Sequence, residues 1–153
     1  MLSDCDLHKL LKRGELVIQP LNVAAIGCAS IDLTLADQFV EYTDVIDSQN
    51  ISVATHSFST STITLPPQGF ILGMTRERIH IPAEYYGFIE TRGNFARAGI
   101  TVSSNDGHID PGTDSKITLE IHNRNSVAVT LHTGDAICQL FVFRLLSPPS
   151  RLY

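Results

Sequence analysis

The first thirteen residues carry the one clear helical pattern of the chain. Ser3 stands at the expected N-cap, Asp6 follows three residues later in the spacing of a capping box, and Gly14 is placed to end the helix. One face of a helix over residues 3–13 carries three leucines, Leu7, Leu10 and Leu11. The sequence therefore predicts a short amphipathic helix that packs on the body of the protein.

After this helix the pattern becomes that of strands. Residues 29–35 alternate apolar and polar positions with period two, and residues 38–42 continue the alternation. Further strand-like runs, separated by proline and glycine turns, lie at 16–18, 63–65, 69–75, 86–91, 116–122, 128–131 and 136–143. Residues 47–62 are rich in Ser and Thr, which predicts a long hairpin or loop. Many short strands at this spacing predict an all-β barrel or sandwich.

Length, composition and charge narrow the class of protein. A chain of 153 residues with 43% apolar and 18% charged residues is typical of one globular domain. The net charge of −5 offers no positive surface for duplex nucleic acid or an anionic membrane, and no apolar run approaches the roughly 18 residues of a membrane span. The N-terminus lacks the pattern of a signal peptide. We therefore expect one domain over residues 1–153, located in the cytoplasm, with no nucleic-acid or membrane partner.

Cysteine and histidine spacing argues against a transition-metal site. Cys5, Cys28 and Cys138 are odd in number, widely separated and without a C-x-x-C pair, which disfavours a disulfide framework and structural zinc. The zinc deaminase pattern, H-x-E followed by P-C-x-x-C, is absent. His108 and His122 have no partner at metal-binding spacing, so we expect surface positions for both.

Two segments place polar groups among apolar strands. Asp32 interrupts a strand pattern, where an aspartate is more often an edge or turn hydrogen-bonder than a functional group. Arg92 and Arg97 lie on either side of a Gly-Asn step. Guanidinium groups beside outward-turned backbone amides form a phosphate cradle, and the alternative is a pair of surface arginines on a short helix.

A third segment, residues 105–112, resembles a β-hairpin and precedes the strand pattern of residues 117–123. Leu119 and Ile121 flank Glu120, so alternation places Glu120 on the opposite face. If that face lines a pocket, desolvation would raise the pKa of Glu120 and suit it to proton transfer. The alternative is a solvent-facing strand carboxylate.

The motifs in these segments resemble the dCTP deaminase and dUTPase superfamily, and most closely its deaminase branch. Six stretches match in order and spacing: the opening M-L-S-D-x-D-L with Ile18-x-Pro20, A-S-I-D-L-T-L at 29–35, R-G-N-F-A-R-A-G-I at 92–100, H-I-D-P-G at 108–112, I-T-L-E-I-x-N at 117–123 and G-D-x-I-x-Q-L at 134–140. The resemblance implies a distorted β-barrel of the dUTPase-like β-clip type and a homotrimer. It also implies active sites at subunit interfaces, where a deoxynucleoside triphosphate binds with Mg²⁺.

The resemblance also implies roles for individual residues. Glu120 matches the general base and proton shuttle of the deaminases, and Arg97 matches the arginine that supports this site. Asp110 matches the carboxylate that activates water for attack on the α-phosphate in the dUTPase branch. Asp32 matches a residue that lies near the magnesium through water, the ion itself being held mainly by substrate phosphates.

Substrate contacts are implied in two further regions. Arg92 matches a phosphate contact beside two positions that are serines in the family's motif. Pyrimidine selection in this superfamily relies largely on backbone groups, here around residues 105–110. The predicted substrate-binding residues are Arg92, Gly93, Asn94, Asp106, Gly107, His108 and Gln139.

Two departures from the family pattern bear on activity. Gly93 replaces a serine that helps position water in deaminases, and loss of such a group costs about 10²-fold in rate. The tail that folds over the triphosphate in the family has no expected counterpart after Tyr153. The sequence predicts zinc-independent deamination of dCTP to dUTP and ammonia. The alternatives are a dUTP diphosphatase, a bifunctional deaminase-diphosphatase, and a catalytically reduced nucleotide-binding homologue.

Overall fold

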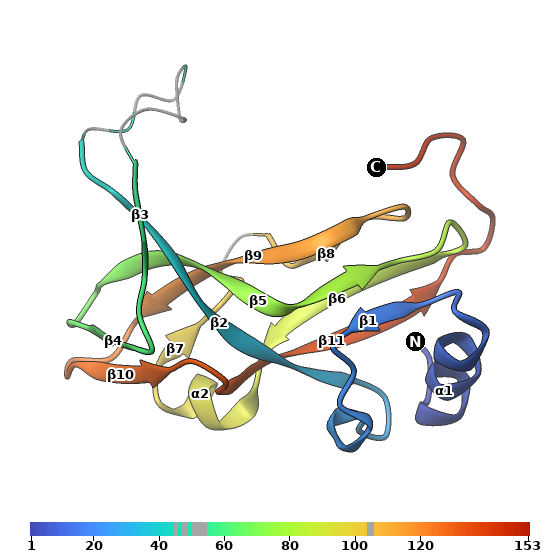
Figure 1. The fold of residues 1–153 in the computed structure, drawn as a ribbon, viewed down its shortest axis with the longest axis horizontal. Helices are drawn as coiled ribbons and strands as arrows, with labels where there is room; N and C mark the ends of the chain where they lie inside the picture. The colour runs from blue at the N-terminus through green and yellow to red at the C-terminus, as the bar shows by residue number, and fades with distance from the viewer. Residues whose placement is uncertain (45, 47–48, 50–54, 104–105) are drawn as a thin grey trace.

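Antiparallel strands are the main secondary structure of the chain (Figure 1). The computed structural model describes residues 1–44, 46, 49, 55–103 and 106–153. The strands are β1 (Val17–Gln19), β2 (Ile31–Tyr42), β3 (Thr55–Ser59), β4 (Thr62–Leu65), β5 (Phe70–His80), β6 (Tyr85–Thr91), β7 (Ile100–Thr101), β8 (His108–Ile109), β9 (Asp114–Asn123), β10 (Val129–His132) and β11 (Ala136–Arg144). The helical elements are α1 (Asp4–Arg13), the 3₁₀ turn η1 (Val23–Ala25) and α2 (Gly93–Arg97).

The main sheet is strongly curled. Its strands follow the order β7-β9-β5-β2-β11-β6-β8, with β1 paired to β5 and β3 paired to β2, while β10 and β4 form a separate pair. The curl brings β6 close to the segment that follows β7: Val102 N donates to Thr91 Oγ1 (3.0 Å), and Ser103 Oγ donates to Ile89 O (3.1 Å). This half-barrel confirms the predicted all-β, distorted-barrel class.

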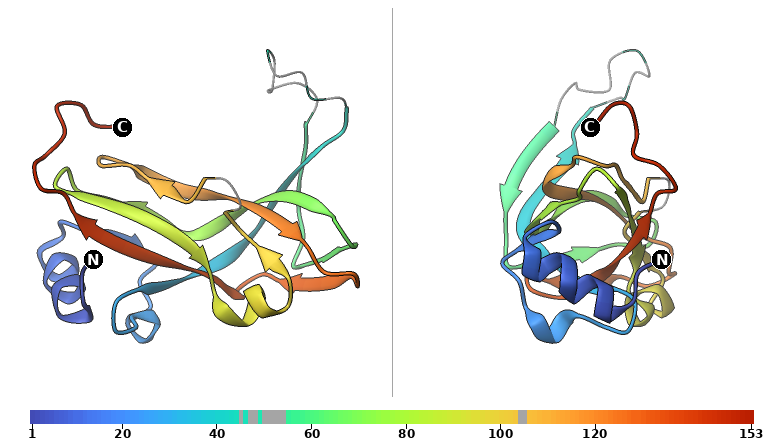
Figure 2. Two further views of the ribbon diagram at one scale, coloured as in Figure 1. Left: turned by 180° about the vertical axis from the view of Figure 1, so that it is seen from behind. Right: turned by 90° about the vertical axis from the view of Figure 1, so that its right-hand side faces the viewer.

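Helix α1 lies across one end of the curled sheet, as the right-hand view of Figure 2 shows. It buries Leu7 and Leu10 and ends at Gly14, whose φ of 69° is the left-handed conformation expected of a C-cap glycine. Ser3 is the N-cap residue, but its hydroxyl donates to the Asp6 carboxylate (3.5 Å) rather than capping a backbone N–H, so the predicted capping box is wrong in this detail. Neither α-helix of the described ranges is long and apolar enough to cross a bilayer.

Most predicted strands are confirmed within a few residues, and the differences lie in short elements. Strand β3 pairs with β2 across the region predicted as a hairpin or loop, of which residues 47–48 and 50–54 lie outside the described residues. Strand β8 pairs with β6 rather than with another strand of the same segment, so the hairpin predicted at residues 105–112 is wrong. Asn105 lies outside the described residues.

Candidate functional site

Asp32 links two strands to the start of α2. It lies on β2 directly opposite Gln139 of β11, and its Oδ1 accepts a hydrogen bond from Gln139 Nε2 (2.8 Å). Its Oδ2 accepts from Arg92 Nε (2.9 Å), and Gln139 Nε2 also approaches Ser30 Oγ (3.3 Å). We call Ser30, Asp32, Arg92 and Gln139 the Asp32 cluster.

Strand alternation produces this cluster. Ile31 and Leu33 point into the core, so Asp32 between them projects to the other face of β2. Gln139 likewise lies between two buried residues of β11. The antiparallel register of the two strands then sets the carboxylate beside the amide.

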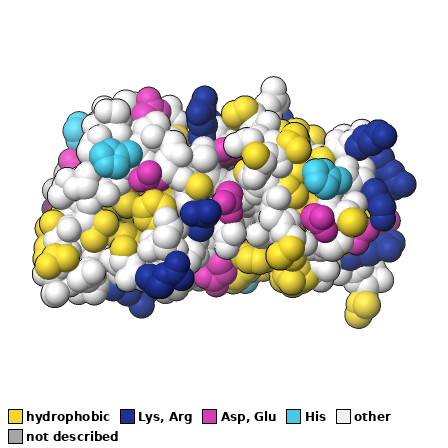
Figure 3. All heavy atoms as spheres, turned by 90° about the horizontal axis from the view of Figure 1, so that it is seen from below, with side chains coloured by type: hydrophobic (Ala, Val, Ile, Leu, Met, Phe, Trp, Pro, Cys, Tyr) yellow, Lys and Arg dark blue, Asp and Glu magenta, His cyan; other side chains and the backbone are white. Residues whose placement is uncertain are grey.

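Arg92 is anchored by Asp32 and keeps donors for a ligand. It is the N-cap residue of α2, and its side chain is 41% exposed. Its Nε is bound to Asp32, and its Nη1 donates to Asn94 Oδ1 (3.4 Å). A guanidinium has five N–H groups, so donors remain for an anion such as a phosphate. Across the face that carries α2 and η1, basic and acidic side chains mix with apolar ones (Figure 3).

Residues 106–112, here called the Asp106 segment, hold a histidine between a carboxylate and two aromatic rings. Asp106 Oδ1 accepts from His108 N (3.3 Å) and lies 3.0 Å from His108 Nδ1. The His108 ring meets Tyr86 and Phe88 edge-on, with centroids 5.9 and 6.3 Å apart. Burial raises the pKa of the Tyr86 hydroxyl, and the charges of Asp110 and Asp106 add to the shift.

Gly107 fastens the Asp106 segment to β6. Its carbonyl accepts a hydrogen bond from Ile89 N (2.8 Å). A Cβ atom at this position would stand 2.8 Å from the carbonyl oxygen of Ile89, so a larger residue would push the segment away from the strand. The glycine therefore allows the close backbone approach.

Glu120 projects from the face of β9 that alternation predicts. Leu119 and Ile121 on either side are 1% and 0% exposed, and Glu120 is partly buried on the opposite face, with its N–H donating to Val102 O (2.8 Å). Lys116 and Thr118 share this face and line a pocket of about 210 Å³ together with Asp106, His108 and Tyr153. Glu120 is not among the residues that line that pocket.

The predicted site residues therefore fall into two groups on one chain. Arg92, Asn94 and Gln139 gather around Asp32, whereas the Asp106 segment meets the outer face of β9. Within the described part of the chain, neither Arg92 nor Arg97 forms an ion pair with Glu120. One group offers guanidinium donors for phosphate, and the other offers carboxylates for proton transfer.

The side chains present suit a magnesium ion that is held mostly by a ligand. Among the described residues, no three His, Cys, Asp or Glu side chains are placed to bind a metal. Both oxygens of Asp32 already accept hydrogen bonds, and its side chain is 20% exposed. The remaining lone pairs fit a contact through water to Mg²⁺, which keeps several waters when phosphates supply its other ligands.

Two polar residues in or near these groups were missed from the sequence. Tyr86 lies beside His108, and Glu77 is a buried carboxylate close to the Asp32 cluster. Tyr86 begins the predicted strand 86–91, whereas Glu77 lies on β5 beyond the predicted strand 69–75, on the buried side of its alternation. For Glu77, the signal available in the sequence was a charged residue at a position where continued alternation would place a buried side chain.

Comparison with known proteins identifies the family. Residues 1–145 match the family model described as dCTP deaminase-like. A protein of Aquifex aeolicus (strain VF5) named "dCTP deaminase, dUMP-forming" is 33% identical over 156 residues, which cover 100% of this chain and 86% of the relative.

Two solved structures show the same fold. The 2′-deoxycytidine 5′-triphosphate deaminase of Agrobacterium tumefaciens superposes with a TM-score of 0.71 and 16% identity over 92% of this chain, which spans 46% of that protein. The dUTPase of Staphylococcus bacteriophage 80alpha gives a TM-score of 0.59 and 16% identity over 89% of this chain and 86% of the dUTPase. The chain belongs to the dCTP deaminase-like family and has the fold that this family shares with dUTPases.

Proposed function

We propose that the protein catalyses zinc-independent, hydrolytic deamination of a cytosine deoxynucleotide in pyrimidine nucleotide metabolism. The simplest reaction converts dCTP and water to dUTP and ammonia. The observation that carries the proposal is the placement of Glu120, a partly buried carboxylate on the face of β9 that the Asp106 segment also meets. The relatives that match the whole chain support a deoxynucleotide substrate.

Glu120 acts as the proton shuttle in this mechanism. Its carboxylate takes a proton from water as the water oxygen bonds to C4 of cytosine, and it delivers that proton to N3. A second proton from the added oxygen then passes to the amino group. The C4–N bond breaks, ammonia leaves, and the carbonyl of uracil forms. One water is consumed for each ammonia released.

The other residues bind and orient the substrate. Arg97 supports the reacting centre, and Arg92, held by Asp32, contacts the phosphates together with Asn94. Backbone groups near Gly107 select the pyrimidine. Magnesium neutralises phosphate charge when it is bound, with Asp32 in contact through water.

We further propose a homotrimer whose active sites combine the two groups of residues from neighbouring subunits. A mixing experiment tests it: Arg92→Ala and Glu120→Gln chains, each inactive alone, should regain part of the ammonia release after subunit exchange. No recovery from mixed trimers would place each site within one chain.

A second candidate function is the formation of dUMP. The Aquifex relative carries that product in its name, and conversion of dCTP to dUMP requires loss of both ammonia and pyrophosphate. Asp110, exposed on the Asp106 segment, is the carboxylate available to activate a second water. Ammonia and pyrophosphate measured separately from dCTP and from dUTP distinguish the candidates. Both products from dCTP support formation of dUMP, ammonia alone supports deamination, and pyrophosphate alone supports a diphosphatase. Thermal stabilisation by nucleotides with neither product supports a binding protein.

A further inference from the structure

Glu77 is a carboxylate on the core-facing side of β5. Its neighbours at period two are buried, and Glu77 itself is only 7% exposed. Arg76 and Arg78 are exposed, since alternation turns them to the opposite face. A charged side chain therefore occupies a position where this strand otherwise carries buried residues.

A bulge in β5 and one threonine of β2 hold Glu77 in place. The register against β9 shifts between Met74 and Arg78, and Thr75 Oγ1 donates to Glu77 O (2.8 Å) inside this irregularity. The carboxylate accepts two hydrogen bonds from Thr34, from its N–H to Oε2 (2.9 Å) and from its Oγ1 to Oε1 (2.6 Å). The side chain is thus oriented by β2, while Thr75 of the same strand fixes the backbone of Glu77.

Among the described residues, no basic side chain is paired with the Glu77 carboxylate. Burial of a carboxylate is costly unless a cation or several hydrogen bonds compensate it. A carboxylate accepts about four hydrogen bonds, and Thr34 supplies two.

This carboxylate opens into a pocket. This pocket, here called the Glu77 pocket, has a volume of about 260 Å³. Asp32 and Thr34 line it on the polar side together with Glu77, and the apolar wall includes Ile18, Pro20, Leu21 and Ala24. It is smaller than the roughly 300–1,000 Å³ of sites for drug-sized ligands, so it suits a molecule of a few heavy atoms.

The buried thiol of Cys138 is affected by the negative charges beside the Glu77 pocket. Its pKa is raised, first by burial and then by the charges of Glu77 and Asp32. The charges of these two carboxylates therefore extend to a thiol in the core.

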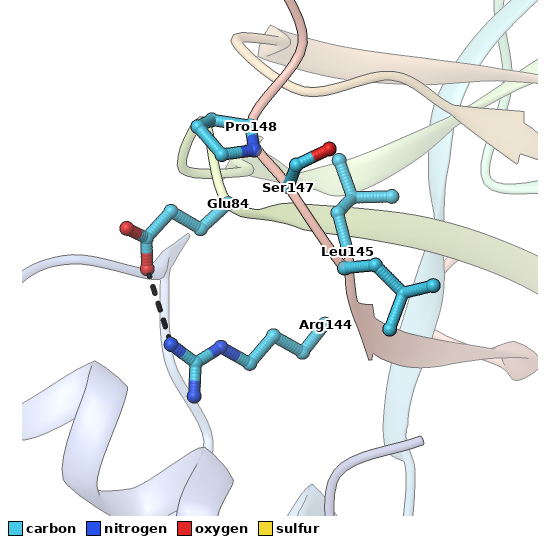
Figure 4. Close-up of a pocket in the computed structure, with 6 residues that line it drawn as sticks. Glu84, Arg144, Leu145, Ser147 and Pro148 are labelled. Carbon is cyan, nitrogen blue, oxygen red and sulfur yellow. Dashed lines mark ion pairs between the residues drawn. The ribbon is translucent and has the colours of Figure 1, made fainter.

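A second pocket of this chain differs from the Glu77 pocket because its carboxylate is paired with an arginine. It has a volume of about 370 Å³, and its carboxylate, Glu84, already faces Arg144 at 3.8 Å (Figure 4). Leu145 and Pro148 also line it. Among the residues that the structure describes, Arg144 supplies a cation to Glu84, and none is paired with Glu77.

We propose that the Glu77 pocket binds a small organic monocation, a primary ammonium or guanidinium group on a short apolar chain. The N–H donors of such a group complete the hydrogen bonding of Glu77, and its carbon chain packs on the apolar wall. Because Asp32 lines the same pocket and also holds Arg92, the bound cation touches the carboxylate that orients this arginine. The proposal does not depend on deamination.

Titration of the full chain without nucleotide tests this proposal. Propylguanidinium chloride and butylammonium chloride should each bind saturably, one per chain, by calorimetry and should raise the thermal midpoint. Sodium chloride at the same ionic strength and neutral 1-butanol should not bind saturably. Glu77→Gln should weaken binding about tenfold or more, because it removes a charge-assisted hydrogen bond. Glu84→Gln should leave binding unchanged.

A second variant keeps the test decisive if Glu77→Gln folds poorly. Ala24 is exposed on η1 and lines the pocket, so Ala24→Phe should block the pocket while Glu77 stays intact. Loss of cation binding in Ala24→Phe supports the proposal. Absence of saturable binding to the wild-type chain at millimolar cation, or binding that survives Ala24→Phe, overturns it.

Discussion

The guanidinium of Arg97 lies against Gly93, one helical turn earlier in α2. A Cβ atom on Gly93 would stand 3.2 Å from Arg97 Nη1, and the space beside this backbone is therefore taken by the arginine. The contact is with the end of a flexible side chain, so Arg97 can move aside for a small residue at this position. Gly93 is also the position where the family's motif carries a serine.

Gly93→Ser should increase ammonia release from dCTP about tenfold or more, because a hydroxyl returns to the reacting centre. The free energy of unfolding should change by less than about 0.5 kcal/mol, since the arginine yields. Steady-state kinetics and denaturant unfolding measure the two effects. Gly93→Ala is the matched control, and an equal gain in that variant would show that the hydroxyl is not the cause.

Asp32→Asn should reduce the free energy of unfolding by about 1–2 kcal/mol, because the carboxylate accepts hydrogen bonds from both Arg92 and Gln139. Nucleotide affinity should also fall, since Arg92 loses its anchor. Urea unfolding and nucleotide titration check both. Asp114→Asn breaks only an exposed pair with Arg78 and should cost less than about 0.5 kcal/mol. Equal losses in the two variants would remove any special role for Asp32.

Long strands were predictable, and contacts between distant strands were not. The apolar run at residues 136–143 predicts β11 (Ala136–Arg144) closely because it follows a Thr-Gly-Asp turn and is interrupted only by Gln139. Strand β8 has only two residues, too few for alternation to appear, and its partner β6 precedes it by about twenty positions. Strand β3 lies in the region predicted as a hairpin or loop, because its residues are polar and mostly exposed and no apolar alternation marks the strand.

Contacts between distant strands were also the part of the candidate site that the sequence did not predict. Asp32, Arg92 and Gln139 were each predicted as site residues, but the Asp32–Gln139 hydrogen bond follows from the register of β2 against β11, which joins positions 107 residues apart. Arg92 reaches Asp32 because β6, which it follows, pairs with β11. Glu77 was missed because the predicted strand 69–75 ends before it, and alternation by itself does not show whether a pocket lies at a residue. Its orientation depends on the bulge in β5.

Gly107→Ala should lower the free energy of unfolding by about 1–3 kcal/mol, because the added methyl group collides with a backbone oxygen that cannot move independently. The Asp106 segment would also separate from β6. Thermal and denaturant unfolding test this. Gly27→Ala is the control, since its nearest contact would be an ordinary 3.4 Å, and a comparable loss there would contradict the steric account.

Cys138 should resist a thiol reagent in the native protein while Cys5 and Cys28 react, because only Cys138 is buried and its pKa is raised. The native state therefore keeps a proton that the unfolded thiol loses above its ordinary pKa of 9.0. The contribution of this thiol to stability is complete below that pH and declines as pH rises further.

Thiol titration with and without denaturant tests whether the native fold protects Cys138 from the reagent. Unfolding of wild type and Cys138→Ala between neutral and alkaline pH tests the pH dependence of stability. The variant should lose less stability as the pH rises. Rapid reaction of all three thiols in the native protein would contradict the burial of Cys138.

The most direct measurement is ammonia release from dCTP by wild type and Glu120→Gln, with nucleotide binding followed in parallel. Glu120→Gln should bind dCTP with nearly unchanged affinity and release ammonia about 10²–10⁴-fold more slowly, because the shuttle for both proton transfers is gone. Glu84→Gln should release ammonia at the wild-type rate. Wild-type ammonia release by Glu120→Gln would contradict the assignment of the chemistry to this carboxylate.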